Sequence, residues 1–197
     1  LGGEEFALLG SGSLLGVEIV PANYVKSSKD IPIDDAWTTI TLRNQQNVSD
    51  SIQKSAQDVG LRVIAVDISR KLVEFIRARA DREGRSQVEA HLGGERSVDL
   101  PRDSVDVMLI CDTYHHFEYP SATLASIHAA LVDGGELVVL DFERIPGVSS
   151  DWILGHVRAG REVFQSEIEA AGFELVEELS TVPLRENYML RFRKLAS

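Results

Sequence analysis

Three runs of almost wholly apolar residues constrain the fold of this chain more than any other feature of its sequence. They occupy residues 62–67, 105–111 and 136–142. Runs of this length, without regular polar alternation, are typical of strands buried on both faces of a parallel sheet. Consecutive parallel strands need a crossover connection, which is usually a helix. The sequence therefore predicts helices between these runs.

The segments between and after the runs show helical spacing. Apolar residues recur every three or four positions in residues 71–83, 121–131 and 160–172. A weaker strand is expected at residues 88–92. Two further strands, at residues 173–179 and 188–193, follow each other without a helix between them. This order predicts an α/β fold, namely a doubly wound, mostly parallel sheet with an antiparallel strand in a C-terminal hairpin.

The first 60 residues show weaker patterns. Residues 37–42 (Trp-Thr-Thr-Ile-Thr-Leu) are a plausible strand, and residues 49–58 are a plausible polar helix. Residues 1–35 have no clear period. We therefore predict an N-terminal extension over residues 1–35 and one domain over residues 36–197.

Composition narrows the classes of partner. The net charge of −11 argues against binding to nucleic acids, which requires a basic surface. The sequence also has no basic amphipathic stretch that would bind an anionic membrane. The longest apolar stretch, residues 6–20, is broken by glycine and serine and is too short for a membrane span. The single cysteine, Cys111, cannot form an internal disulfide or a cysteine-based zinc site, which favours a reducing, cytoplasmic location.

Polar residues gather where the expected strands end. Asp67 ends the first buried run, residues 112–116 (Asp-Thr-Tyr-His-His) follow the second, and Asp141 lies near the end of the third. Ligands of open parallel sheets bind beyond the carboxyl ends of the strands. An acid such as Asp67 can accept hydrogen bonds from both hydroxyls of a ribose. It could equally cap the following helix.

Three segments in order, together with the C-terminal pattern, resemble a known enzyme class. The segments are residues 63–69 (Val-Ile-Ala-Val-Asp-Ile-Ser), 106–117 (Asp-Val-Met-Leu-Ile-Cys-Asp-Thr-Tyr-His-His-Phe) and 131–142 (Leu-Val-Asp-Gly-Gly-Glu-Leu-Val-Val-Leu-Asp-Phe). They resemble class I S-adenosylmethionine-dependent methyltransferases, particularly the small-molecule group that includes the ubiquinone/menaquinone-biosynthesis enzymes. Ala170-Ala171-Gly172-Phe173 before a strand fits the same group. The resemblance covers about residues 62–194 and implies a Rossmann-like fold.

The resemblance implies a cofactor, a substrate class and roles for five residues. S-adenosylmethionine would be the cofactor and a small organic molecule the methyl acceptor. Asp67 would bind the ribose hydroxyls, Ile68 would pack on the adenine, and Glu95 would lie near the adenine amino group. Asp112 and Thr113 would line the methionine side. Glu95 could instead be a solvated loop acid.

Two neighbouring histidines are the candidate catalytic residues. His115 and His116 lie where the acceptor and the methyl group would meet, and an imidazole titrates near neutrality. Either could therefore remove a proton from the acceptor. Alternatively, one packs against or caps the following helix and the other is solvated. A metal site built from Asp112, His115 and His116 is disfavoured, because three neighbours on one loop rarely converge on an ion. We therefore predict no metal site.

The glycine loop of such enzymes is missing from its expected place. Family members carry Gly-x-Gly-x-Gly after the first strand, and counting back from Asp67 leads to residues 43–47 (Arg-Asn-Gln-Gln-Asn). Bulkier residues in such a turn would weaken binding by roughly 2–4 kcal/mol. The glycine-rich residues 10–13 (Gly-Ser-Gly-Ser) are disfavoured as a substitute, because residues 14–20 leave no room for a helix before a strand. The alternative function is thus a catalytically silent binding or structural module, which could act in a homo-oligomer.

Overall fold

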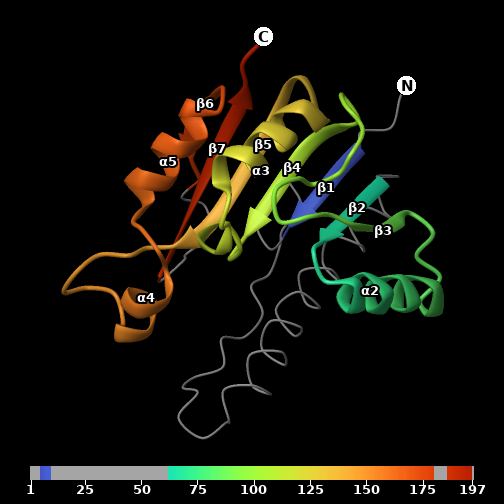
Figure 1. Ribbon diagram of the computed structural model, residues 1–197, viewed down its shortest axis with the longest axis horizontal. Coiled ribbons are helices and arrows are strands. Elements are labelled where there is room, and N and C mark those ends of the chain that lie inside the picture. The colour runs from blue at the N-terminus through green and yellow to red at the C-terminus, as the bar shows by residue number, and fades with distance from the viewer. Residues whose placement is uncertain (1–4, 10–61, 180–185, 197) are drawn as a thin grey trace, which may run out of the picture.

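The computed structural model describes residues 5–9, 62–179 and 186–196, which form one seven-stranded sheet with helices packed on it (Figure 1). The strand order is β3-β2-β1-β4-β5-β7-β6. The strands are β1 Glu5–Leu9, β2 Arg62–Asp67, β3 Val88–Leu92, β4 Val105–Cys111, β5 Leu131–Phe142, β6 Phe173–Glu178 and β7 Asn187–Lys194. The described helices are α2 Arg70–Arg82, α3 Pro120–Ala130, α4 Asp151–His156 and α5 Arg161–Ala170, with a 3-10 turn, η1, at Tyr114–His116.

Strands β1 to β5 are parallel, and β7 is antiparallel to both of its neighbours, β5 and β6. From β1 the chain builds outward through β2 to β3, and then returns to add β4 and β5 on the other side. This reversal places a topological switch point between β1 and β4, where open α/β sheets bind ligands. The parallel sheet and the antiparallel C-terminal hairpin agree with the sequence prediction.

The central strand β1 differs from the sequence prediction. Its register pairs Phe6 with Val63 of β2 and with Val107 of β4, so Glu5–Leu9 lies between these two buried strands. The sequence suggested residues 37–42 for the strand before the cofactor loop, and those residues lie outside the described part of the chain. Residues 5–9 are part of the sheet, although they were expected from the sequence to belong to an N-terminal extension.

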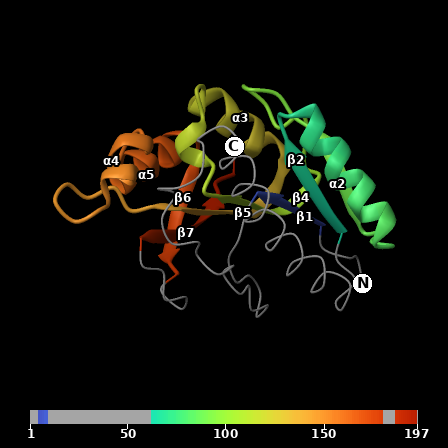
Figure 2. The same ribbon diagram turned by 90° about the horizontal axis from the view of Figure 1, so that it is seen from below.

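The larger core covers one face of the sheet. Leu124 and Ile127 of α3 and Phe164 and Ile168 of α5 are fully buried against residues of β4, β5 and β7. Figure 2 shows α3 and α5 on the same side of these strands. The opposite face carries a smaller buried cluster from the same strands, formed by Val107, Leu109, Cys111, Val138, Leu140 and Met189. Buried side chains therefore alternate between the two faces, as a covered parallel sheet requires.

Helix ends and one tight turn follow local chemistry. The Ser69 hydroxyl accepts a hydrogen bond from the Leu72 amide and caps the start of α2, and Pro120 is the first residue of α3.

Strand β5 begins at Leu131, earlier than the sequence suggested, and passes through the glycine pair Gly134-Gly135. A Cβ on Gly135 would lie 2.9 Å from the Val132 carbonyl oxygen and 3.0 Å from that of Asp106, so this position excludes larger residues.

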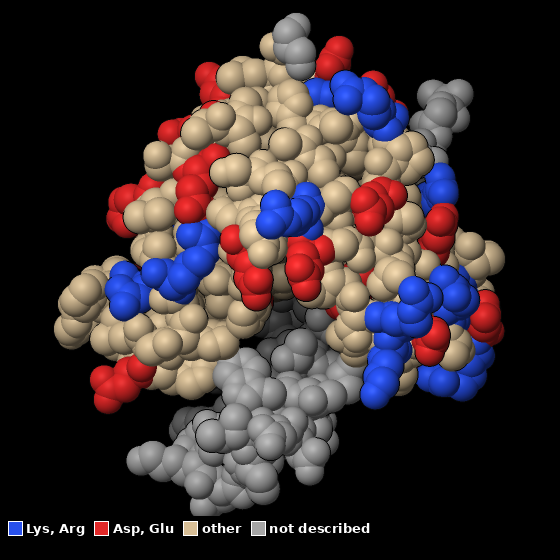
Figure 3. All heavy atoms as spheres, viewed as in Figure 1, with Lys and Arg blue, Asp and Glu red and all other residues tan. Residues whose placement is uncertain are grey.

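Charged side chains are mixed on the face seen in Figure 3. Basic residues gather over α2, where acidic residues lie among them. This face thus shows no continuous basic surface of the kind that binds nucleic acid. None of the helices in residues 62–179 is long and apolar enough to cross a membrane.

The packing of α5 leads to a first prediction. Ile168 is fully buried, whereas Val163 on the same helix is 48% exposed. Ile168→Ala should lower the free energy of unfolding by about 2–5 kcal/mol, because it leaves a cavity, and Val163→Ala should change it by less than about 0.5 kcal/mol. Urea unfolding followed by circular dichroism measures both. Equal effects of the two substitutions would contradict the described packing of α5.

Candidate functional site

The carboxyl ends of the parallel strands bring the polar residues to one edge of the sheet (Figure 1). Asp67 ends β2, and the register aligns it with Leu92 at the end of β3. On the other side of β1, Asp112 follows β4, and Asp141 lies one residue before the end of β5. The edge therefore has two groups of candidate residues, one beyond β2 and β3 and one beyond β4 and β5.

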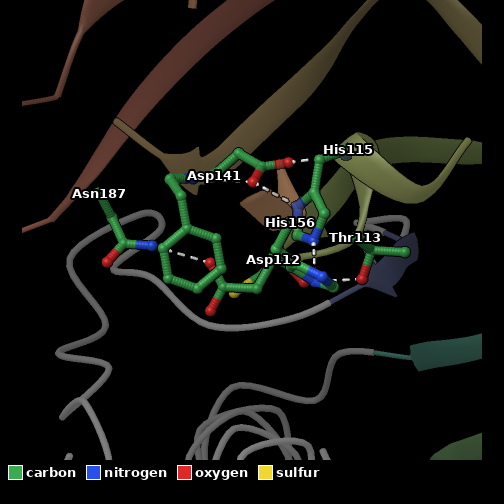
Figure 4. Close-up of polar contacts among 8 residues, drawn as sticks. Asp112, Thr113, His115, Asp141, His156 and Asn187 are labelled. Atoms are coloured by element: carbon green, nitrogen blue, oxygen red, sulfur yellow. Dashed lines mark hydrogen bonds and ion pairs between the residues drawn. The ribbon is translucent and has the colours of Figure 1, made fainter. Parts of the chain in front are cut away.

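Asp141 and His115 form the centre of the second group (Figure 4). Asp141 is fully buried, and its Oδ1 lies 2.6 Å from Nδ1 of the buried His115. The backbone amide of His115 donates to Oδ2 of Asp141 at 3.0 Å, and the amide of Phe142 donates to Oδ1 at 2.7 Å. A buried carboxylate needs such donors, because an unpaired charge in the interior is strongly unfavourable. Because a carboxylate oxygen only accepts hydrogen bonds, Nδ1 is the donor of His115 in this contact, and Nε2 is the ring nitrogen left to face other groups.

Two further histidines surround His115. Nε2 of His156, at the end of α4, lies 3.2 Å from Nε2 of His115. The His116 ring packs against His115 with centroids 4.1 Å apart and lies 4.9 Å from the His156 ring. Burial and the nearby histidines lower the pKa of His116 to about 4, and burial lowers the pKa of His156. Both rings are therefore neutral at physiological pH.

Aromatic packing positions His156. The Trp152 ring stacks on the His156 ring with centroids 4.6 Å apart, and Trp152 also contacts Phe142 edge-on. Ile153 and Val157 of the same segment are buried in the core. The structure assigns Ile153 and Val157 to the core and leaves Trp152 partly exposed beside the histidines.

The turn that carries His115 and His116 is anchored from a second direction. The fully buried Tyr114 donates a hydrogen bond from its hydroxyl to Oε2 of Glu167 on α5 at 2.9 Å. Arg158 binds both carboxylate oxygens of Glu167, at 2.8 and 2.6 Å. Burial, followed by the hydrogen bond to Glu167, raises the pKa of Tyr114. The η1 turn is thus fixed both to β5 and to α5.

Asp112 has a strained backbone and an unusual ionisation. Its φ of 48° lies in the left-handed region, which aspartate and asparagine tolerate better than most residues. Asn187 of β7 donates to its Oδ1 at 2.8 Å. Burial, and next the charge of Asp141, raise the pKa of Asp112 to about 7. The neighbouring Thr113 turns its hydroxyl back to the Cys111 carbonyl oxygen at 2.8 Å.

The first group contains the other predicted cofactor residues. Oδ1 of the half-buried Asp67 accepts from the Ser69 amide at 2.7 Å, and burial raises the pKa of Asp67. Ile68 exposes 64% of its surface at this edge. Glu95 is an exposed residue of the loop after β3. These three lie beyond β2 and β3, whereas Asp112, Thr113, His115 and His116 lie beyond β4.

Three residues of the site were not identified from the sequence. Asp141 was named only as a strand end, and neither His156 nor Asn187 was placed in the site. Asp141 carried a usable signal, because an acid within an otherwise apolar buried strand requires a buried partner. His156 and Asn187 carried no local signal, since their contacts span 41 and 75 residues of chain.

Comparison with known proteins agrees with this architecture, an open α/β sheet with candidate ligand-binding residues at its switch point. Residues 49–139 match the family model of a methyltransferase domain. No curated protein matches the sequence significantly.

Several solved structures share the fold at low sequence identity. A SAM-dependent methyltransferase from Aquifex aeolicus matches with a TM-score of 0.63 and 12% identity, over 98% of this chain and 82% of that one. The [4+2]-cyclase SpnF matches with a TM-score of 0.67 and 14% identity, over 100% and 76%. The YcgJ protein of Bacillus subtilis matches with a TM-score of 0.59 and 13% identity, over 99% and 93%. The chain therefore has the fold of these proteins, a Rossmann-like α/β fold.

The ionisation of Asp112 gives a second prediction. Because its pKa is raised from 3.8 to about 7, the folded state binds a proton more tightly than the unfolded state, and stability should fall as pH rises between about 4 and 7. Asp112→Asn keeps an acceptor for Asn187, tolerates the left-handed backbone and removes the charge. The variant should gain free energy of unfolding relative to the wild type across this range, by up to about 4 kcal/mol at pH 8.

Urea unfolding of both proteins at pH 4.5, 6 and 8 measures this difference. A difference that stays constant over the three pH values would show that Asp112 does not titrate as described.

Proposed function

We propose that the protein transfers a methyl group from S-adenosylmethionine to a small organic acceptor. The observation that carries this proposal is Asp67 at the carboxyl end of β2, one strand from the switch point and followed by the exposed Ile68. S-adenosylmethionine is the cofactor that the methyltransferase-domain match of residues 49–139 and the similar structures support. The ubiquinone/menaquinone-like group is the narrower class that the sequence resemblance favours.

In this proposal, the group beyond β2 and β3 binds the adenosine part of the cofactor, and the group beyond β4 and β5 lies on the methionine and acceptor side. Asp67 would accept hydrogen bonds from the ribose hydroxyls with Oδ2, since Oδ1 already accepts from Ser69. Ile68 would cover one face of the adenine, and Glu95 would lie near its amino group. Asp112 and Thr113 would line the methionine end. The methyl group would then point toward the histidines beyond β4 and β5.

The glycine loop can be proposed at a new place. Strand β1 ends at Leu9, and the next residues in sequence are Gly10-Ser11-Gly12-Ser13. This stretch was disfavoured from the sequence because residues 14–20 were expected to be the next strand. Among the described residues, the strand that follows β1 along the chain and pairs with it in parallel is β2, which begins at Arg62. We therefore propose residues 10–13, rather than residues 43–47, as the loop that approaches the cofactor.

The histidines would handle the proton of the acceptor. Methyl transfer is an in-line displacement, so a base is needed only when the acceptor must lose a proton. In this proposal His115 acts as that base with Asp141 orienting its ring and stabilising the imidazolium, as a carboxylate does in other histidine pairs. His116 and His156 would link His115 to solvent. The proposal names no particular acceptor, because the loops that form acceptor pockets vary in sequence.

Cofactor binding tests the proposal directly. Calorimetric titration with S-adenosylmethionine and S-adenosylhomocysteine should show micromolar binding to the wild type. Asp67→Ala should weaken it by about 10-fold or more, because each charge-assisted hydrogen bond contributes about 1.5–3 kcal/mol. Asp81→Ala, an exposed acid of α2, serves as the control and should leave binding unchanged. No heat from a folded sample at millimolar cofactor would overturn the proposal and favour the silent binding module.

The position of the glycine loop has its own test. Gly12→Val should weaken binding of S-adenosylhomocysteine by roughly 5- to 30-fold, because a branched side chain in a tight turn costs about 1–2 kcal/mol. Gln45→Val should have little effect. The reverse pattern would return the loop to residues 43–47.

A further inference from the structure

The three histidines beyond β4 and β5 are arranged as ligands of one metal ion. We propose that His115, His116 and His156 bind a divalent transition-metal ion, with zinc the chemical type that fits best. No metal site was expected from the sequence, and the set disfavoured there contained Asp112 in place of His156. The inference does not depend on cofactor binding at Asp67, but an ion bound to Nε2 of His115 would occupy the lone pair that the proposed base uses, so the two roles of His115 exclude each other.

The spacing of the ring nitrogens supports this inference. Two nitrogens bound to zinc at about 2.0–2.1 Å in a tetrahedron lie about 3.3 Å apart. Nε2 of His115 and Nε2 of His156 are 3.2 Å apart, and the ligand atoms of all three histidines lie within 4.8 Å of one another. The His116 ring therefore lies within reach of an ion held between His115 and His156.

The partner of His115 supports the inference independently. Histidines that bind metals almost always donate their other ring N–H to a carboxylate or a carbonyl, which fixes the tautomer and orients the ring. Oδ1 of Asp141 accepts a hydrogen bond from Nδ1 of His115 at 2.6 Å, and two backbone amides donate to the same carboxylate. Nε2, the remaining ligand atom, points toward His156 (Figure 4).

The origin of the ligands answers the objection raised from sequence. His115 and His116 belong to the η1 turn, whereas His156 comes from α4, 41 residues away from His115. A site built from two separate elements can surround an ion as a single loop cannot. Both elements are firmly placed, since Tyr114 and Ile153 beside them are fully buried.

The donor set indicates the type of ion. Imidazole nitrogens suit zinc, copper, nickel and iron, whereas magnesium and calcium prefer oxygen ligands. Three histidines leave a fourth position, which in open zinc sites holds water or substrate.

A direct hydrogen bond between the His115 and His156 rings would also give a separation of 3.2 Å, so the experiment must distinguish that bond from a metal site. Full-length protein without an affinity tag is treated with a chelator, dialysed and titrated with Co²⁺ and with Zn²⁺. One equivalent of Co²⁺ should bind with a Kd below about 1 μM and give the intense visible absorption of a four-coordinate site. One equivalent of Zn²⁺ should abolish that absorption.

Variants identify the ligands. His156→Gln should abolish the cobalt spectrum or weaken binding by more than about 100-fold, and Asp141→Asn should weaken it by about 10- to 100-fold, as for other partners of ligating histidines. His91→Gln is the control, because His91 lies on β3 and bonds to the Asp99 carbonyl oxygen. Should Asp141→Asn fail to fold, His156→Gln decides alone, since His156 is only partly buried.

The outcomes differ from those of the cofactor test. Absence of cobalt binding, or binding unaffected by His156→Gln, overturns the metal site and leaves a hydrogen-bonded histidine pair. Titration of the same His156→Gln sample with S-adenosylhomocysteine shows whether the cofactor site is intact, so failure of one proposal does not imply failure of the other.

Discussion

The buried carboxylate of Asp141 is the constraint on which the rest of the site depends. It accepts from the His115 ring, from the His115 amide and from the Phe142 amide. Two of these bonds join the end of β5 to the turn after β4, so the orientation of His115 is determined by the sheet itself. Removing one partner of such a buried pair leaves an uncompensated charge, which is far more unfavourable than losing an exposed contact. The site and the core are therefore stabilised by the same interactions.

The order of the strands explains why these residues meet. Strand β1 lies between β2 and β4, and the chain adds β2 and β3 on one side of it and β4 and β5 on the other. The connections therefore run in opposite directions from β1 and leave a crevice at the carboxyl ends of β1 and β4. The antiparallel β7 then returns along β5, with Asn187 paired to Phe142, and brings the Asn187 amide to Asp112. The antiparallel β7 thus contributes Asn187 to the same end of the sheet at which the parallel strands β4 and β5 finish.

Local periodicity made much of the fold predictable from the sequence, whereas contacts between distant residues were missed. Buried apolar runs and helical spacing identified β2 to β7 and three helices, because each is long enough to show a period. Strand β1 has five residues and is separated from β2 by residues 10–61, so its place depended on pairing with Val63 and Val107. His115 was identified from its position after a strand. Its partners Asp141 and His156 are 26 and 41 residues away, and no local pattern links them.

The fold alone does not decide the chemistry of this edge. Among the structures that share it, one is a SAM-dependent methyltransferase and another is a [4+2]-cyclase, so the same sheet supports different reactions. What distinguishes one reaction from another is the set of groups beside the cofactor. Under the function proposed above, those groups would be the histidines, with the buried Asp141 behind them, while Asp67 and Ile68 lie across β1 beyond β2. Because β1 separates the two groups, substitutions can remove either one alone, and the contribution of each to binding and to chemistry can be measured in the same folded protein.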